Sequence, residues 1–322
     1  MKKFTIFILV LAMLSCSVVG LSSCSTGKYT IGICQLAPHD ALDSASNGFM
    51  QAIKDELGNE NVTFLYQNAQ GDPNTCSTII NDFTTKNVDL ILANATGSLT
   101  TAANATMTIP ILGTSITDYA SALELKDFTG TVGGNISGTS DLAPLDKQAE
   151  MIKEIFPDAK KVALLFCSAE SNSLFQVEKM EGYLAELNIE TERFSFSDSN
   201  DVAQISASAA ARADVIYAPT DNTIANFAAT VYGSIGDTPL IAGEENTCRG
   251  CGIATLSIDY YDLGYKTGLM AAKILKGEEK IEDMPIEYAN ASTKKYMKSR
   301  CIELGIDTDA LDALGYVPIA EE

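Results

Sequence analysis

The chain has 322 residues, of which 46% are hydrophobic, and it carries a formal net charge of −20 at pH 7. Such an acidic surface repels phosphate backbones and anionic lipid headgroups, and no basic run or basic amphipathic helix offsets it. Nucleic acid is therefore excluded as a partner, and so is charge-driven binding to a membrane surface. The length suffices for one large or two ordinary domains, and we expect two lobes.

The N-terminal segment has the composition of an export signal. Lys2 and Lys3 precede an apolar run over 4–19, and Leu21, Ser22 and Ser23 lie directly before Cys24. A positive start, a short apolar run and small residues ahead of a cleavage site are typical of an export signal rather than a membrane span.

This segment resembles the lipobox of bacterial lipoproteins. The resemblance implies a signal peptide over 1–23, a lipid on Cys24, a short tether over 24–28 and a body outside the cytoplasm, anchored to the cell membrane by the lipid. The alternatives are an ordinary cleaved signal and cleavage at Cys16.

Short apolar runs alternate with helical patterns along the remaining chain. Several runs are apolar throughout, as in parallel strands that are buried on both faces. Between them, apolar residues recur at three- and four-residue steps, as from Leu42 to Leu57 and from Val177 to Leu187, which predicts amphipathic helices. The alternation predicts an α/β fold with doubly wound parallel sheets. The predicted strands span 29–34, 62–67, 88–93, 109–116, 162–167, 191–196, 215–218, 240–243 and 253–258, and a further strand that crosses between the lobes is predicted over 285–288.

The alternation occurs twice, which predicts two Rossmann-like lobes with parallel sheets flanked by helices and joined by a hinge. We assign 29–140 plus about 257–280 to the N-terminal lobe, and 141–256 plus about 284–322 to the C-terminal lobe. Between them, the glycines at 130, 133, 134 and 138 indicate either a hinge or an ordinary loop. Neither lobe begins with a dinucleotide-binding or Walker-type glycine motif, so no nucleotide-phosphate site is predicted.

Eight cysteines are present, and six remain once Cys16 and Cys24 are set aside. Six cysteines allow fifteen pairings, and the sequence does not choose among them. Cys248 and Cys251 form a C-x-x-C motif, which we place in a Gly-rich loop, whereas a thioredoxin-like site needs the pair at the start of a helix. We therefore favour a local disulfide or two free thiols. The single histidine, His39, is distant in sequence, and no metal site is predicted.

Short polar motifs lie at the predicted strand ends, and they span nearly the whole body of the chain. They are 31–35, 39, 41–43, 67–72, 95–96, 117–118, 170–173, 219–223, 243–245 and 258–264. In this order they resemble the extracytoplasmic solute-binding proteins of ABC importers, with a type I periplasmic-binding-protein fold. Within that class the chain is similar to the tryptophan/tyrosine substrate-binding lipoproteins. It departs from their pattern at Gly97 and Tyr119, where proline is usual, and these changes bear on ligand preference.

In open α/β sheets, ligands bind beyond the carboxyl ends of the strands, where helix N-termini present free N–H groups. An amino acid needs donors for its carboxylate and an anion for its ammonium. We expect Thr96, Ser98 and the segment 171–173 to donate to the carboxylate, and Asp221, followed by Glu244, to bind the ammonium. Helix N-capping is the alternative role for Asp221 and for 171–172. The full candidate set is Gln35, His39, Leu42, Thr96, Gly97, Ser98, Thr117, Ser171, Asn172, Ser173, Thr220, Asp221, Asn222 and Glu244.

The resemblance implies a lipid-anchored monomer that closes its lobes on a small amino acid, tryptophan, tyrosine or phenylalanine, and delivers it to an ABC permease and its ATPase. It implies no cofactor and no enzymatic activity. The alternatives are another cargo (a nucleoside, a sugar or a branched-chain amino acid), a ligand-sensing lipoprotein, and an extracellular thiol redox enzyme that uses Cys248 and Cys251.

Overall fold

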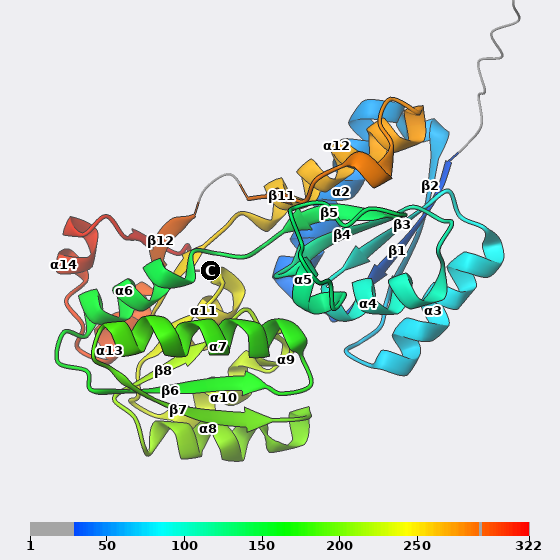
Figure 1. Cartoon of the computed structure of the whole chain (residues 1–322). Coiled ribbons are helices and arrows are strands. Elements are labelled where there is room, and N and C mark those ends of the chain that lie inside the picture. Colours follow the sequence, from blue (N-terminus) through cyan, green and yellow to red (C-terminus); the bar gives the residue numbers. More distant parts are fainter. Residues whose placement is uncertain (1–28, 290–291, 322) are drawn as a thin grey trace, which may run out of the picture.

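The computed structural model describes residues 29–289 and 292–321, which form two α/β lobes (Figure 1). The predicted signal peptide, Cys24 and the tether lie outside the described residues. The N-terminal lobe is built on a six-stranded parallel sheet in the order β11-β5-β4-β3-β1-β2. Its strands are β1 (Tyr29–Gln35), β2 (Val62–Asn68), β3 (Leu90–Asn94), β4 (Ile111–Ile116), β5 (Ile136–Ser140) and β11 (Glu287–Tyr288).

The C-terminal lobe is built on a seven-stranded sheet in the order β13-β12-β10-β9-β8-β6-β7. Its pairings are parallel except that between β10 and β12. Its strands are β6 (Lys161–Cys167), β7 (Glu190–Phe196), β8 (Val215–Ala218), β9 (Leu240–Ala242), β10 (Ala254–Ser257), β12 (Thr293–Tyr296) and β13 (Val317–Pro318).

Helices cover both faces of each sheet, because the central strands are apolar on both sides. On one face of the N-terminal sheet pack α2 (Asp40–Leu57) and α12 (Tyr260–Lys276), and on the other pack α3 (Pro73–Lys86), α4 (Thr96–Ala105) and α5 (Tyr119–Ala122). The C-terminal sheet carries α6 (Leu145–Ile155), α7 (Ser171–Glu186), α13 (Lys298–Glu303) and α14 (Thr308–Ala313) on one face. Its other face carries α8 (Val202–Ala210), α9 (Asn222–Asn226), α10 (Ala228–Ile235) and α11 (Glu245–Cys251).

The predicted α/β architecture is confirmed, and each predicted strand is present within two residues at either end. The sequence analysis missed β5, β12 and β13. In β5 the residues are small and mostly polar, and Gly138 has a φ of +141°. An ideal Cβ there would lie 2.1 Å from the Gly113 carbonyl oxygen of the neighbouring strand. The hinge or loop interpretation is therefore wrong for Gly138, which lies inside a strand where only glycine fits.

The chain passes between the lobes after β5, after β10 and after β11 (Figure 1). Strand β11 pairs with β5 of the N-terminal sheet through Glu287 and Tyr288. We expected the chain to return to the C-terminal lobe at about residue 284. In the structure it stays paired with the N-terminal sheet as far as Tyr288. Within residues 29–289 and 292–321, no helix has the length and apolarity that crossing a membrane requires.

Glycines allow α2 and α12 to approach each other closely. An ideal Cβ on Gly264 would lie 1.9 Å from the Ala45 carbonyl oxygen, and one on Gly48 would lie 2.1 Å from the Tyr261 carbonyl oxygen. These contacts are with backbone atoms, which cannot rotate away. The packing of the two helices therefore requires glycine at both positions.

We expect Gly264→Ala to destabilise the protein by about 1 to 3 kcal/mol, because overpacking at a backbone contact outweighs the gain in helix propensity. The matched control is Gly182→Ala in the exposed part of α7, where nothing lies within 4 Å of the added Cβ. That change should stabilise by about 0.5 to 1 kcal/mol. Urea unfolding measures both, and equal effects would contradict the packing argument.

Candidate functional site

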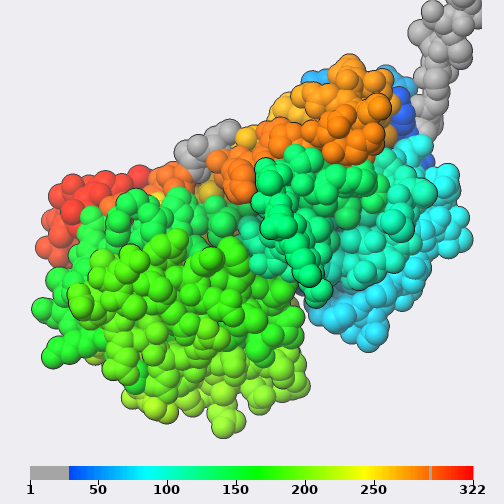
Figure 2. Space-filling view, in the orientation of Figure 1, coloured from blue at the N-terminus to red at the C-terminus, as the bar shows by residue number. Residues whose placement is uncertain are grey.

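The carboxyl ends of the two sheets face each other across an interlobe cleft, and three connected cavities lie there. The central cavity measures about 10 Å³, which is room for about one water. It is lined by His39, Leu42, Ser115, Thr117, Asp141, Asn172, Thr220, Asp221, Asn222, Ala225, Glu244 and Tyr260. Figure 2 shows the two lobes in contact around this cleft.

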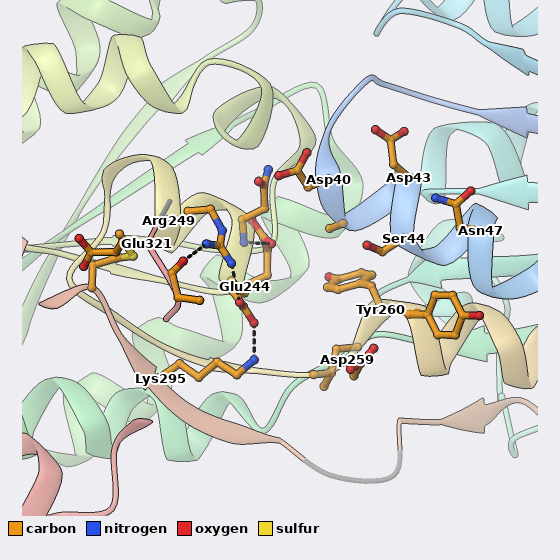
Figure 3. A pocket seen from close by; sticks show the side chains of 17 residues that line it. Asp40, Asp43, Ser44, Asn47, Glu244, Arg249, Asp259, Tyr260, Lys295 and Glu321 are labelled. Atoms are coloured by element: carbon orange, nitrogen blue, oxygen red, sulfur yellow. Dashed lines mark hydrogen bonds and ion pairs between the residues drawn. The ribbon is translucent and has the colours of Figure 1, made fainter. Parts of the chain in front are cut away.

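Two larger cavities open on either side of the central one. The outer cavity, of about 470 Å³, shares Asn172 and Asn222 with it and is also lined by Leu36, Ala37, Gln70, Gly71, Pro73, Thr96, Gly97, Thr100, Cys167, Ala169, Glu170, Ser171, Ser197, Asp198, Ser199, Thr223, Asn226 and Phe227. The hinge cavity, of about 960 Å³, shares Glu244 and Tyr260 and includes Ile258 and Asp259, where the chain passes between the lobes. Figure 3 shows it, with α2 side chains on one side and Glu244, Arg249 and Lys295 on the other.

A β-bulge directs Ser115 toward the central cavity. The register between β4 and β5 shifts between Gly113 and Ile116, and Ser115 has a φ of +57°. A non-glycine residue in the left-handed region is strained, and such strain persists where the surroundings enforce it. The Ser115 hydroxyl is buried and has no hydrogen-bond partner among the described residues. The bulge therefore supplies an unsatisfied polar group to the cavity.

Asp141 is a buried carboxylate with one oxygen free. Its Oδ2 accepts a hydrogen bond from the Tyr260 hydroxyl at 2.9 Å, whereas Oδ1 has no partner among the described residues. Burial raises the pKa of Asp141 to about 6, the nearby Glu244 carboxylate adds to the rise, and the hydroxyls of Tyr260 and Thr117 oppose it. Leaving a buried carboxylate oxygen unpaired is costly, so this group is suited to receive a cation or donor.

His39 connects the two lobes. It is the N-cap residue of α2, and its Nε2 lies 3.2 Å from Asn222 Oδ1 of the C-terminal lobe. The Asn222 amide nitrogen donates to Glu170 at 2.7 Å, so Oδ1 is the acceptor and Nε2 carries the proton. In the neutral ring Nδ1 is then an acceptor, and it has no partner among the described residues. The central cavity thus holds a second unpaired acceptor beside Asp141.

Asp221 lines the same cavity, but its carboxylate is already engaged. Oδ2 accepts from the Cys167 backbone N–H and the Ser173 hydroxyl, both at 2.7 Å, and Oδ1 accepts from the Ile224 N–H at 2.9 Å as the N-cap of α9. Burial raises the pKa of Asp221, and the neighbouring Glu170 carboxylate raises it further. Asp221 therefore joins three elements of the C-terminal lobe.

Glu244 is also a helix cap. Its carboxylate accepts from the Asn246 and Thr247 backbone N–H groups at the start of α11. Glu170 accepts in turn from the backbone and side chains of Asn222 and Thr223. Among the acidic residues of the central cavity, Asp141 is thus the one whose oxygen is left unpaired within the described chain.

Most of the predicted site residues line the cleft. His39, Leu42, Thr117, Asn172, Thr220, Asp221, Asn222 and Glu244 line the central cavity, and Thr96, Gly97 and Ser171 line the outer one. Three predicted residues line none of these cavities: Gln35 bonds to Ala37, Asp43 and Ser46, Ser98 contacts two cysteines, and Ser173 donates to Asp221. Ser115, Asp141, Ala225 and Tyr260 line the central cavity and were absent from the predicted set.

The C-x-x-C motif lies in helix α11 and not in the expected loop, so that placement is wrong. Cys251 is the last residue of the helix, and both thiols are buried. Burial raises the pKa of Cys248 and of Cys251, so neither is a reactive thiolate. Within the residues that the structure describes, no cluster of histidine, cysteine or carboxylate side chains is suited to a metal ion.

Two α/β lobes with a polar cleft between them define a binding protein of the periplasmic type. A family model described as the ABC transporter substrate binding protein matches residues 30–310. The tyrosine-binding protein of Clostridioides difficile is 37% identical over 266 residues, which is 81% of this chain and 76% of that protein. The chain therefore belongs to the ABC transporter substrate-binding protein family, whose members work outside the cytoplasm with an ABC transporter.

Solved structures show the arrangement of the lobes. The ABC domain from Streptococcus pneumoniae in complex with L-Trp is 29% identical, with a TM-score of 0.85, and covers 91% of this chain and 100% of that one. A ligand-free, open substrate-binding protein from Clostridium difficile is 34% identical with the same coverage, yet its TM-score is 0.69. The open structure thus has the higher sequence identity but superposes less well. The arrangement of the lobes here is therefore closer to that of the L-Trp complex than to that of the open structure.

We expect Asp221→Ala to destabilise the C-terminal lobe by about 2 to 5 kcal/mol, because it removes an N-cap and leaves further buried donors unpaired. Asp72→Ala is the control, since Asp72 caps α3 at an exposed position, and its loss should be clearly smaller. Urea unfolding measures both variants. Full stability of Asp221→Ala together with lost ligand binding would instead indicate a ligand-binding role.

Proposed function

We propose that this protein captures an aromatic L-amino acid, tyrosine or tryptophan, between its lobes and delivers it to an ABC permease. The relative named as tyrosine-binding and the solved L-Trp complex support this ligand class. We also propose that Cys24 carries the lipid anchor and that the protein acts as a monomer without enzymatic activity. The buried, unpaired Asp141 oxygen carries the proposal of an amino acid ligand.

The central cavity is suited to an ammonium group. Asp141 Oδ1, His39 Nδ1 and the Ser115 hydroxyl are its unpaired buried polar atoms, and each can accept a hydrogen bond. An ammonium has three N–H donors, so it can supply one to each acceptor and also neutralises the carboxylate. A neutral sugar or nucleoside lacks the positive charge. We therefore propose Asp141, in place of Asp221, as the ammonium partner.

The outer cavity suits the carboxylate and the side chain of the ligand. Helices α4 and α7 begin at this cavity, and neither has a side chain that caps its N-terminus. Free N–H groups at such N-termini bind anions. Leu36, Pro73 and Phe227 add apolar surface, and a volume of about 470 Å³ lies within the range of small-molecule sites.

We expect L-tyrosine, L-tryptophan or both to stabilise the full chain purified in detergent. A ligand at 100 times its Kd adds about 2.7 kcal/mol, enough to raise the Tm by several degrees. Because the sequence contains no tryptophan, a change in L-tryptophan fluorescence reports binding without competing emission from protein tryptophan. Nucleosides, sugars and branched-chain amino acids complete the panel, and stabilisation by one of these alone would overturn the aromatic assignment.

We expect Asp141→Asn to weaken amino acid binding roughly 10- to 150-fold, the equivalent of one charge-assisted hydrogen bond of about 1.5 to 3 kcal/mol. Asp40→Asn is the matched control, because Asp40 lines the hinge cavity and not the central one. Isothermal titration calorimetry measures both. Equal affinities for Asp141→Asn and the unaltered protein would contradict the assignment.

The same carboxylate predicts a pH dependence. The pKa of Asp141 in the empty protein is raised to about 6, and a bound ammonium favours the ionised form. Below pH 6 binding must therefore expel a proton, and affinity should fall by up to roughly tenfold per pH unit, while it stays flat from pH 7 to 8. Asp141→Asn should reduce this slope. His39→Gln is measured alongside, because His39 is titratable and lines the same cavity.

A further inference from the structure

Two cysteines far apart in sequence meet inside the N-terminal lobe. Cys34 lies near the end of β1 and Cys76 in the first turns of α3, and their sulfurs are 3.5 Å apart. Both side chains are fully buried. The Ser98 hydroxyl lies 3.7 Å from each sulfur. Among the described residues, Cys34 and Cys76 are the cysteines whose sulfurs contact each other. In the C-x-x-C motif of α11, the Cys251 thiol instead donates to the Thr247 carbonyl oxygen.

We propose that Cys34 and Cys76 form a disulfide after export, while Cys248 and Cys251 remain thiols. The sulfurs need to approach by about 1.5 Å to reach the ~2.05 Å bond length, which small side-chain rotations allow. The family works outside the cytoplasm, where disulfides form and persist. The inference rests on this juxtaposition and is independent of which ligand binds.

The two thiols are also electronically unequal. The contact between the two sulfurs lowers the pKa of Cys76, and the same contact, together with burial, raises the pKa of Cys34. The nearby Thr101 and Ser98 hydroxyls lower the pKa of Cys76 further. A thiolate near the start of a helix is the better nucleophile. In the folded lobe, Cys76 is therefore the more readily ionised of the two thiols.

The oxidant is a disulfide, whether a small molecule or an exported thiol oxidoreductase. The thiolate of one of the two cysteines attacks one sulfur of that disulfide and releases the other as a thiol, which leaves a mixed disulfide. The second cysteine then loses its proton and attacks the protein sulfur of the mixed disulfide, which releases the second external thiol. Two protein thiols and one external disulfide thus become one protein disulfide and two external thiols. The exchange takes place before folding has buried the pair.

The bond would fix one wall of the outer cavity. The segment between β2 and α3 contributes Gln70 and Gly71 to that wall, α3 contributes Pro73, and Cys76 lies in the first turn of the same helix. The cross-link spans 42 positions of sequence, so it restricts the unfolded chain appreciably. The disulfide would therefore stabilise the N-terminal lobe and hold α3 against β1.

Peptide mapping of the full chain tests the pairing. The protein is exposed to oxidised glutathione during refolding, denatured in urea at about pH 8 with iodoacetamide present so that free thiols are alkylated at once, and digested with trypsin. Cleavage after Lys28, Lys54 and Lys86 places Cys34 in peptide 29–54 and Cys76 in peptide 55–86, and cleavage after Arg249 separates Cys248 from Cys251. We expect a 29–54/55–86 cross-linked peptide that reduction abolishes, with Cys248 and Cys251 alkylated.

A second measurement uses stability. Dithiothreitol should lower the Tm of the unaltered, oxidised protein by several degrees. It should have the same effect on the matched control Cys248→Ala/Cys251→Ala and none on Cys34→Ala/Cys76→Ala. Alkylation of Cys34 and Cys76 in the unaltered protein to the same extent as Cys248 and Cys251 would overturn the proposal. This mapping needs no variant, so a variant that fails to fold cannot obscure its result. If the unaltered protein binds tyrosine but contains no 29–54/55–86 cross-link, the disulfide proposal is refuted and the proposed function is not.

Discussion

The structure depends on how carboxylates are accommodated where the two lobes meet. Parallel sheets direct the N-termini of their helices toward the cleft, and these present backbone N–H groups that buried carboxylates satisfy. Asp221 and Glu244 are held in this way at the starts of α9 and α11. Asp141 lies at the passage between the lobes, where no helix N-terminus pairs its second oxygen. This difference separates a structural carboxylate from one available to a ligand.

Local backbone strain in β4 also determines which side chains face the central cavity. A regular β4 would alternate its side chains between the faces of the sheet, and the bulge between Gly113 and Ile116 interrupts that alternation. Ser115 then faces the cavity, while Gly138 of β5 allows its strand to lie against Gly113. The two strands that meet at this irregularity also lead into Thr117 and Asp141. Two of the three proposed ammonium acceptors, Ser115 and Asp141, thus follow from one strand pair, and His39 comes from the start of α2.

The sequence predicted the lobes because their strands are long apolar runs that only a doubly buried sheet explains. It failed at β5, where small residues and Gly138 are typical of a loop, and Asp141 was missed for the same reason: it follows a strand that was not recognised. Asp221 was the favoured ammonium partner because it follows an obvious strand and precedes a helix. That position equally suits an N-cap, and only the hydrogen bonds of its oxygens distinguish the two roles. The C-x-x-C motif was read as a loop because its glycine and polar neighbours hide a short helix.

The unpaired atoms of the central cavity supply a physical link between lobe closure and the proposed ligand binding. With the lobes together, Asp141, His39 and Ser115 are buried, and one polar atom of each lacks a partner among the described residues. An unsatisfied buried polar group costs about 1 to 3 kcal/mol, so each of these groups that stays unpaired opposes closure of the empty cleft. The His39–Asn222 contact alone offsets little of that cost. In the proposed complex, an ammonium that pairs with all three groups would remove the penalty, and the free energy of these hydrogen bonds would then favour lobe closure around the ligand.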